Sequence, residues 1–254
     1  MRVEILAVPG LPEVQPGDDL AALIRAAAGE TGPSVVLAVA QKIVSKAEGA
    51  IVDLRTIQPS ALARSWAAEG NKDARLIELI LAQSRRIVKM DRGVIISETH
   101  HGFVCANAGV DQSNVDQSNV DQANVPGGDF ATVLPADPDA SARRLHASLG
   151  CGAVIITDTF GRPWREGLVD VAIGVAGLEP LEDLRGRVDR HGQKLSSTIV
   201  AVADQLAAAA GLVMRKAEGC PVALIHGFEW QPAADPSKST GRALLRKPEQ
   251  DLFR

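Results

Sequence analysis

Short apolar runs, bounded by polar or turn residues, recur along most of the chain. Runs rich in Val, Ile and Ala predict strands, because β-branched side chains pack well on a pleated surface. Such runs lie at residues 3–8, 34–40, 50–54, 132–135, 152–160, 169–177 and 220–228. Between residues 85 and 110, alternating and β-branched positions predict two or three further strands.

Amphipathic and alanine-rich stretches lie between these runs and predict helices at residues 20–30, 59–69, 72–84, 138–149 and 195–214. The last of them, LSSTIVAVADQLAAAAGLVM, is the longest helical signal in the chain. Strands and helices mix without a regular strand–helix–strand rhythm. We therefore expect an α+β or irregular α/β fold, with mixed sheets and helices, rather than a doubly wound parallel sheet.

The composition is that of a globular protein. The 254 residues have room for one large domain or two small ones, and 46% of them are hydrophobic while only 3% are aromatic. The core must therefore consist of Ala, Val, Leu and Ile. A net charge of −4 gives the chain as a whole no basic surface for nucleic acid or an anionic membrane. The sequence shows no signal peptide and no membrane-spanning run, so we expect a cytoplasmic protein.

Few residues have the spacing of a familiar site. Cys105, Cys151 and Cys220 are far apart and lack a CxxC spacing, so we expect reduced, mostly buried thiols. His100 and His101 are adjacent, and adjacent side chains on a strand face opposite ways, so they do not predict a shared metal ion. The motifs GxxxxGK[ST], GxGxxG, HExxH and GxSxG do not occur. Any nucleotide must therefore bind in a less familiar cradle.

A five-residue unit, DQ(S/A)NV, occurs three times in succession at residues 111–125. Three copies are too few for a solenoid, because each repeat of a solenoid buries its face only on a neighbour. Asp and Asn favour turns, so a solvated loop is the simplest interpretation. An Asp followed three residues later by an Asn also suits a ligand site, since carboxylates bind divalent cations and amides contact bases, sugars or phosphates.

Two further stretches carry polar residues at the end of a predicted strand. Asp158 follows the apolar run GAVII, where a rigid strand can hold a carboxylate at a cleft, although the same residue can simply cap the next turn. Lys42 and Lys46 follow another buried run, and lysines at such a place either bind phosphate or belong to a solvated helix start.

In order along the chain, several stretches resemble the family of coenzyme F-420-0:L-glutamate γ-ligases: GLPEVQPGDDL, QKIVSKAEG, ETHHGFVCANAGVDQSNV, DPDASA, VIITDTFGRPWREG and VAVADQLAAAAGLVM. The resemblance covers about residues 3–227. It implies two lobes around a nucleotide cleft and a homodimer. It also implies a ligase domain at residues 1–228, an extended tail at 229–254, and no fused nitroreductase-like domain of the kind that some members carry.

The activity that the resemblance implies is the addition of L-glutamate, through γ-linkages, to coenzyme F-420-0 in coenzyme F-420 biosynthesis. GTP would be the co-substrate and a pair of Mg²⁺ or Mn²⁺ ions the cofactors, with K⁺ as a further candidate. A free carboxylate resists attack by an amine, so the γ-phosphate of GTP would first form an acyl phosphate, which the amine of glutamate then attacks. Three other interpretations stay open: a nucleotide-dependent ligase for another acid, a non-catalytic nucleotide-binding relative, and a repeat-mediated interaction module.

The resemblance also assigns roles to residues of this sequence. Nucleotide contacts fall to Leu11, Pro12, Glu13, Val14, Gln41, Lys46, Asn114, Met214, Arg215, Lys216, Ala217, Glu218 and Gly219. Metal ligands fall to Asp111, Asp158 and Thr159, and the catalytic residues are Asp111, Asp158 and Lys46. The sequence departs from the family at Arg215, where members carry Gly, and the protonated amine of Lys216 cannot ligate a cation. The loop at residues 214–219 is therefore a poor source of a second metal ligand.

The family carries one DxxNV unit where this chain has three, so the ten additional residues are interpreted as an in-frame duplication of a functional loop. Only one copy can fill a single site. The first copy, with Asp111 and Asn114, directly leaves a predicted strand, and a strand places a ligand rigidly. We therefore favour the first copy, with Asp121 and Asn124 of the third copy as the alternative.

Overall fold

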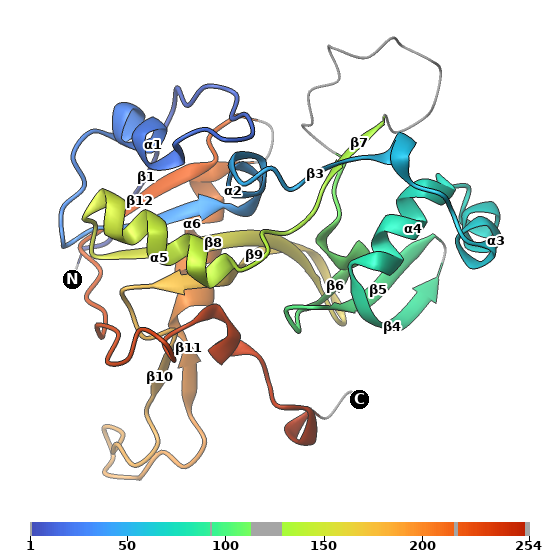
Figure 1. Cartoon of the computed structure of the whole chain (residues 1–254). Coiled ribbons are helices and arrows are strands. Elements are labelled where there is room, and N and C mark those ends of the chain that lie inside the picture. The colour runs from blue at the N-terminus through green and yellow to red at the C-terminus, as the bar shows by residue number, and fades with distance from the viewer. Residues whose placement is uncertain (1, 92, 113–128, 216–217, 252–254) are drawn as a thin grey trace.

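The computed structural model describes residues 2–91, 93–112, 129–215 and 218–251. Its centre is a five-stranded sheet with the strand order β1-β12-β2-β8-β9 (Figure 1). The strands are β1 (Glu4–Ala7), β2 (Val36–Ala40), β8 (Ala153–Arg162), β9 (Arg165–Ala176) and β12 (Val222–His226). Within this sheet β2 and β8 pair in parallel, and the other neighbours are antiparallel. Each strand overlaps an apolar run from which the sequence predicts one.

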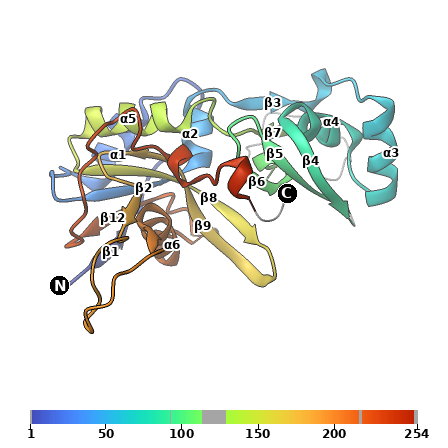
Figure 2. The same ribbon diagram turned by 90° about the horizontal axis from the view of Figure 1, so that it is seen from below.

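Helices cover both faces of this sheet (Figure 2). They are α1 (Leu20–Ala28), α2 (Gln41–Ala47) and α5 (Pro138–Leu149) on one face and α6 (Val202–Met214) on the other. On β8, Val154 and Ile156 pack under the first group, whereas Ala153 and Ile155 pack against α6. Because successive strand residues point to opposite faces and both faces are covered, β8 is apolar without a polar alternation.

Capping residues explain where the helices begin and end. Asp19 precedes α1, and its carboxylate accepts a hydrogen bond from the N–H of Ala22 at 3.0 Å. Asp137 caps α5 in the same way, and Gly150 ends that helix in the left-handed region. The sequence predicts α5 with the bounds that the structure has. None of the helices that the structure describes has the length and apolar character needed to cross a lipid bilayer.

A second group of elements stands beside the central sheet (Figures 1 and 2). It comprises α3 (Ala61–Gly70), α4 (Ala74–Ala82), the sheet of β4 (Ser84–Asp91), β5 (Val94–Thr99) and β6 (Val104–Ala106), and the pair of β3 (Ile51–Asp53) and β7 (Phe130–Thr132). These elements enclose their own apolar cluster, which includes Leu54, Ile80 and Ile95. β6 packs against β8 and so joins this group to the central sheet. The mixed α+β architecture expected from the sequence is confirmed.

A hairpin of β10 (Leu181–Asp183) and β11 (Ile199–Ala201) precedes α6. The helix predicted from residue 195 begins only at Val202, so that prediction was wrong over residues 195–201. Ile199 and Val200 are β-branched and pair with β10, which favours a strand at this point.

The chain after β12 is held to the sheet by two carboxylates. The hydroxyl of Ser239, a residue that is 2% exposed, donates to Glu179 at 2.7 Å. Asp139, near the start of α5, accepts from the N–H of Gly241 at 2.6 Å and from the N–H of Val175 at 2.9 Å. Residues 229–251 are thus irregular but anchored, and they include two short 3₁₀ turns, Gly241–Leu244 and Pro248–Gln250.

We expect Asp139→Ala to lower the free energy of unfolding by about 3 kcal/mol, because two buried N–H groups lose a charged acceptor. Asp139→Asn keeps one carbonyl oxygen and should cost less. Urea unfolding followed by circular dichroism measures both variants, with Glu229→Ala, a change at an exposed residue, as the control. An Asp139→Ala protein as stable as the parent would show that these bonds do not anchor the tail.

Candidate functional site

The ends of several strands meet at one end of the central sheet. Because β2 and β8 run parallel while β12 is antiparallel to β1 and β2, the carboxyl ends of β1, β2 and β8 lie together with the start of β12. Ala40 at the end of β2 is in register with Thr157, and its N–H donates to the carbonyl of Pro221 at 2.8 Å. Four segments lie next to these ends: residues 11–14 after β1, helix α2 after β2, residues 158–159 within β8, and residues 218–219 before β12. Ligands commonly bind outside the carboxyl ends of strands in open sheets.

Asp111, in the first copy of the repeated unit, is held by backbone pairing. Its N–H donates to the carbonyl of Thr132 at 3.0 Å, and the N–H of Thr132 donates back at 2.8 Å. The Thr132 hydroxyl adds a bond to the Asp111 carbonyl at 3.1 Å. The Asp111 carboxylate accepts from Nζ of Lys42 at 2.8 Å. Since Lys42 is the second residue of α2, this ion pair places Asp111 beside the end of β2.

The chain reaches Asp111 through a turn of left-handed residues. Asn107, Ala108 and Gly109 have φ angles of 54°, 53° and 72°. Asn and Gly tolerate this region, but Ala108 is strained in it. A Cβ on Gly109 would lie 2.7 to 2.9 Å from side-chain atoms of Leu134, so glycine is required there. Backbone strain beside a predicted ligand is typical of functional sites.

Cys105 lies between this turn and Asp158. The pKa of its thiol is raised to about 12, chiefly by burial and also by the negative charge of Asp158, while a hydrogen bond from the backbone of Gly109 opposes the shift. The thiol is therefore neutral near pH 7 and is no nucleophile. Its position shows that the turn leading to Asp111 and the strand carrying Asp158 both approach the same side chain.

Lys46 joins α2 to the loop at residues 11–14. Its side chain is 6% exposed and forms an ion pair with Glu13, which is 55% exposed. At the preceding residue of α2, the Ser45 hydroxyl lies 2.9 Å from Oε1 of Gln41, one turn earlier, and 2.7 Å from the carbonyl of Val133. Gln41 and Lys46 are thus both nearly buried, in contacts that fix α2 against its neighbours.

The loop at residues 11–14 divides its side chains between the core and the surface. Val14 is buried and Leu11 packs against the same apolar cluster, whereas Pro12 and Glu13 are exposed. The apolar pair anchors the loop, and the exposed pair lies at its surface, where Glu13 meets Lys46.

Asp158 and Thr159 both lie in β8, and their side chains point to opposite faces of the sheet. Even-numbered residues of β8 pack on the side of α2, and odd-numbered residues pack on the side of α6. The alternation continues, so Asp158 points to the side of α2 and Cys105, and Thr159 points to the side of α6. There the Thr159 hydroxyl donates to Oδ1 of Asp170 at 2.6 Å. The residues assigned to metal therefore form two groups: Asp111 with Asp158 on one side, and Thr159 on the other.

The loop expected to close the nucleotide pocket follows α6. Met214 ends this helix and is buried beneath the sheet. Arg215 has a φ angle of 27° and pairs with Glu218 at 2.9 Å, and both of these side chains are more than half exposed. Gly219 is also left-handed, with a φ angle of 67°. The assigned residues that lie outside the described part of the chain are Lys216, Ala217 and Asn114, with Asp121 and Asn124 of the alternative copy.

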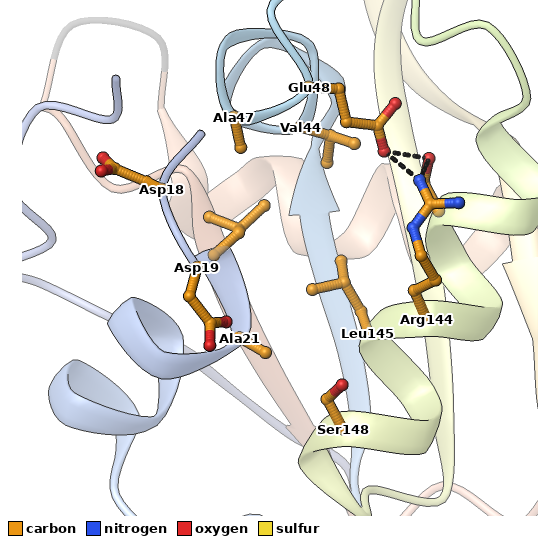
Figure 3. Close-up of a pocket in the computed structure, with 11 residues that line it drawn as sticks. Asp18, Asp19, Ala21, Val44, Ala47, Glu48, Arg144, Leu145 and Ser148 are labelled. Atoms are coloured by element: carbon orange, nitrogen blue, oxygen red, sulfur yellow. Dashed lines mark hydrogen bonds and ion pairs between the residues drawn. The ribbon is translucent and has the colours of Figure 1, made fainter. Parts of the chain in front are cut away.

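A pocket of about 240 Å³ opens elsewhere, between α1, α2 and α5 (Figure 3). Its lining includes Glu48, which accepts hydrogen bonds from Ser141 and Arg144. None of the residues assigned to nucleotide or metal lines this pocket. We interpret it as the seam between three helices rather than as the candidate site.

The structure is that of an α+β protein in which two carboxylates and two lysines gather at one end of a mixed sheet. Such a set suits an enzyme or binding protein for a phosphorylated ligand. The family model described as F420-0:Gamma-glutamyl ligase matches residues 10–227. The chain therefore belongs to the F420-0:gamma-glutamyl ligase family, as the resemblance in its motifs indicates.

Curated relatives match over the full length of the chain. The coenzyme F420:L-glutamate ligase of Methanothermobacter thermautotrophicus is 46% identical, with 100% of both chains covered. Proteins of the same name from Methanopyrus kandleri and Methanocaldococcus jannaschii are 45% and 38% identical, covering 100% of this chain and 98% and 97% of theirs. The similarity thus extends over the tail at residues 229–254, where the motifs give no alignment.

The structure adds residues to the site that the sequence left unassigned. Lys42 was only one of two lysines at a helix start, and nothing in the sequence pairs it with Asp111. Thr132 and Asp170 lay in runs interpreted as strands. One feature of the sequence could have singled out Asp170: it is a carboxylate inside the otherwise apolar run VDVAIGVAG.

The three cysteines are free thiols, as expected. We expect iodoacetamide at pH 8 to alkylate Cys220 in the folded protein and to spare Cys105 and Cys151, because burial raises the pKa of these two thiols to about 12 and about 11. Peptide mass spectrometry measures the labelling, and in denaturant all three should react. Equal labelling of Cys105 and Cys220 in the folded protein would contradict the buried position of Cys105 near Asp158.

Proposed function

We propose that this protein is a GTP-dependent ligase that adds L-glutamate, through γ-linkages, to coenzyme F420-0 in coenzyme F420 biosynthesis. Its full-length relatives carry the name coenzyme F420:L-glutamate ligase. The observation that carries the proposal is the meeting of residues 11–14, α2, Asp111 and Asp158 at one end of the sheet. These segments are far apart in the sequence, and a shared ligand explains why they converge.

The reaction joins a carboxylate of the acceptor to the amine of glutamate. The carboxylate oxygen attacks the γ-phosphorus of GTP, GDP leaves, and an acyl phosphate forms. The amine then attacks the acyl carbon, inorganic phosphate leaves, and the amine loses a proton. This sequence needs no Ser, Cys or His nucleophile, which agrees with the neutral thiol of Cys105. It needs positive charge at the phosphates and fixed geometry.

Two lysines of α2 supply positive charge. Lys42 faces Asp111 at the mouth of the sheet end, where it can reach a phosphate group. Lys46 is nearly buried and paired with Glu13, so it holds the loop at residues 11–14 against α2 and adds charge from behind the site. Both roles depend on the rigidity of α2, because a phosphate contact gains most when its donor is already positioned.

Asp111 and Asp158 present oxygen ligands, which suit a hard divalent cation. Among the described residues, no group of three or more His, Cys, Asp or Glu could hold a metal ion. The described residues thus offer few ligands, and phosphate oxygens and water would complete the shell, as is usual for Mg²⁺ bound with nucleotides. When bound, Mg²⁺ or Mn²⁺ would neutralise phosphate charge during transfer.

The same proposal places the nucleotide and the acceptor between two lobes. One lobe is the central sheet with its helices, and the other is the group of α3, α4 and β4 to β6. Their junction runs along β6 and β8, next to Cys105 and Asp158. The homodimer and the cytoplasmic location expected above also belong to this proposal.

The test is a turnover assay read by mass spectrometry, with purified protein, GTP, Mn²⁺, L-glutamate and coenzyme F420-0. We expect a product heavier by one or more glutamyl units, with one GDP released for each unit. GDP release that requires a different acid would redirect the proposal to that substrate. Nucleotide binding without any turnover would identify a non-catalytic relative instead.

The repeated loop offers a matched pair of variants. We expect Asp111→Asn to lower kcat/KM by at least 100-fold, because Thr132 and Lys42 hold this aspartate at the sheet end. Asp121→Asn makes the same chemical change in the third copy and should leave activity within about twofold of the parent. The reverse pattern, an active Asp111→Asn and an inactive Asp121→Asn, would assign the site to the third copy.

A further inference from the structure

The α6 side of the site contains a carboxylate that no motif singled out. Asp170 in β9 is in register with Thr159 in β8 and accepts from the Thr159 hydroxyl at 2.6 Å. A short bond from a hydroxyl to a carboxylate is charge-assisted and fixes the rotamer of the donor. Because the hydroxyl hydrogen is used in this bond, the lone pairs of the Thr159 oxygen face away from Asp170 and can accept from, or coordinate, another group.

α6 leaves a gap for this carboxylate at Gly211. A Cβ on Gly211 would lie 2.3 Å from Oδ2 of Asp170 and 3.1 Å from its Cγ. Glycine is a poor residue for a helix interior, so its place in the alanine-rich α6 needs a reason. The space for Asp170 is such a reason. Gly211 also stands one turn before Met214, where the loop at residues 214–219 begins.

A second contact ties β9 to the same helix. The register of β9 shifts opposite Ile156 and Thr157, which marks a bulge. The N–H of Ala172, beside this bulge, donates to Oδ1 of Asp204 at 3.0 Å. Asp204 and Gly211 are separated by about two helical turns and so lie on one face of α6. The helix therefore meets this segment of β9 at two points, through Asp204 at Ala172 and through Gly211 at Asp170.

Among the described residues, no basic side chain forms an ion pair with Asp170, whose carboxylate accepts the hydrogen bond from Thr159. A half-buried carboxylate in this state attracts a cation, because removing it from water without a positive partner is costly.

We propose that Asp170 is a positioning residue of the ligase site, which holds the Thr159 hydroxyl on the α6 side and supplies the negative charge that a divalent cation needs there. This inference rests on the proposed function. The family resemblance assigns a cation to Thr159, which is neutral, and the loop after α6 offers Arg215 and Lys216 where a ligand would be expected. Asp170 provides the missing carboxylate, in direct contact with Thr159.

The first test measures Mn²⁺ binding rather than turnover. Free Mn²⁺ is titrated by electron paramagnetic resonance in the presence of a non-hydrolysable GTP analogue. We expect Asp170→Asn to weaken Mn²⁺ binding by about 10- to 100-fold, the usual loss when a residue that orients a metal ligand is changed. Glu182→Gln removes a carboxylate from the β10 hairpin, away from the sheet end, and should bind as the parent does.

Thr159 and Asp170 should behave as one unit. Thr159→Val removes the hydroxyl, and we expect the double variant with Asp170→Asn to bind Mn²⁺ no more weakly than the weaker single variant. Gly211→Ala should also weaken binding, since the new methyl group displaces the Asp170 carboxylate without changing its charge. Leu212→Ala, at the adjacent residue that is 71% exposed, is the matched control on α6.

Thermal unfolding shows whether each variant is folded, and Asp170→Asn is close to isosteric. A folded Asp170→Asn protein with the Mn²⁺ affinity of the parent would overturn the inference. A parent that binds Mn²⁺ and the analogue but forms no glutamylated product would overturn only the proposed function, because the binding comparison needs no turnover. A parent that binds no Mn²⁺ in the presence of the analogue would overturn both.

Discussion

The parallel pairing of β2 with β8 is the constraint on which the candidate site depends. It sets Ala40 beside Thr157, so that α2 begins next to Asp158 and Thr159. Parallel neighbours require a long crossover, and here the crossover contains the whole second group of elements and α5. Asp111 lies within that crossover. Its backbone pairs with Thr132, and its carboxylate contacts Lys42 at the start of α2. The same connection that makes the sheet possible therefore brings Asp111, the predicted metal ligand, back to the sheet end.

Stability alone does not explain the polar contacts at this end. Asp111 is 36% exposed, and an ion pair as exposed as this one contributes about 0 to 1 kcal/mol. The strained turn at Ala108 works against folding. What stabilises this part of the chain is the apolar packing of β2, β8 and their helices. That packing holds the strand ends in place, so the charged side chains there are not needed for the stability of the fold.

The sequence predicts most of the central sheet because its signals are local. α5 has an Asp cap, a Pro in its first turn and a Gly at its end, and the structure has the bounds that these residues predict. Residues 195–201 misled the prediction because their apolar pattern continues into α6, while their pairing with β10 is a tertiary contact. Periodicity identifies a strand but not its neighbour.

The candidate site divides in the same way. Asp111 and Asp158 could be singled out from their chemistry and their places after strands. That β2 and β8 are parallel neighbours, and that Thr159 faces α6, depends on pairing and register, which the sequence does not encode locally. The sequence did not indicate a role for Asp170, because a single carboxylate in an apolar run is compatible with an ordinary buried strand.

On the proposed function, Lys42 and a divalent cation compete for the same carboxylate. Lys42 holds Oδ2 of Asp111 at 2.8 Å, so a cation that takes this oxygen must displace the ammonium group. The phosphates of a nucleotide offer Lys42 another partner, which removes the cost of that displacement. Nucleotide and cation should therefore favour each other's binding, and by linkage the coupling is equal in both directions. Although the site contains oxygen ligands for a metal, it would resist a metal that arrives without its nucleotide.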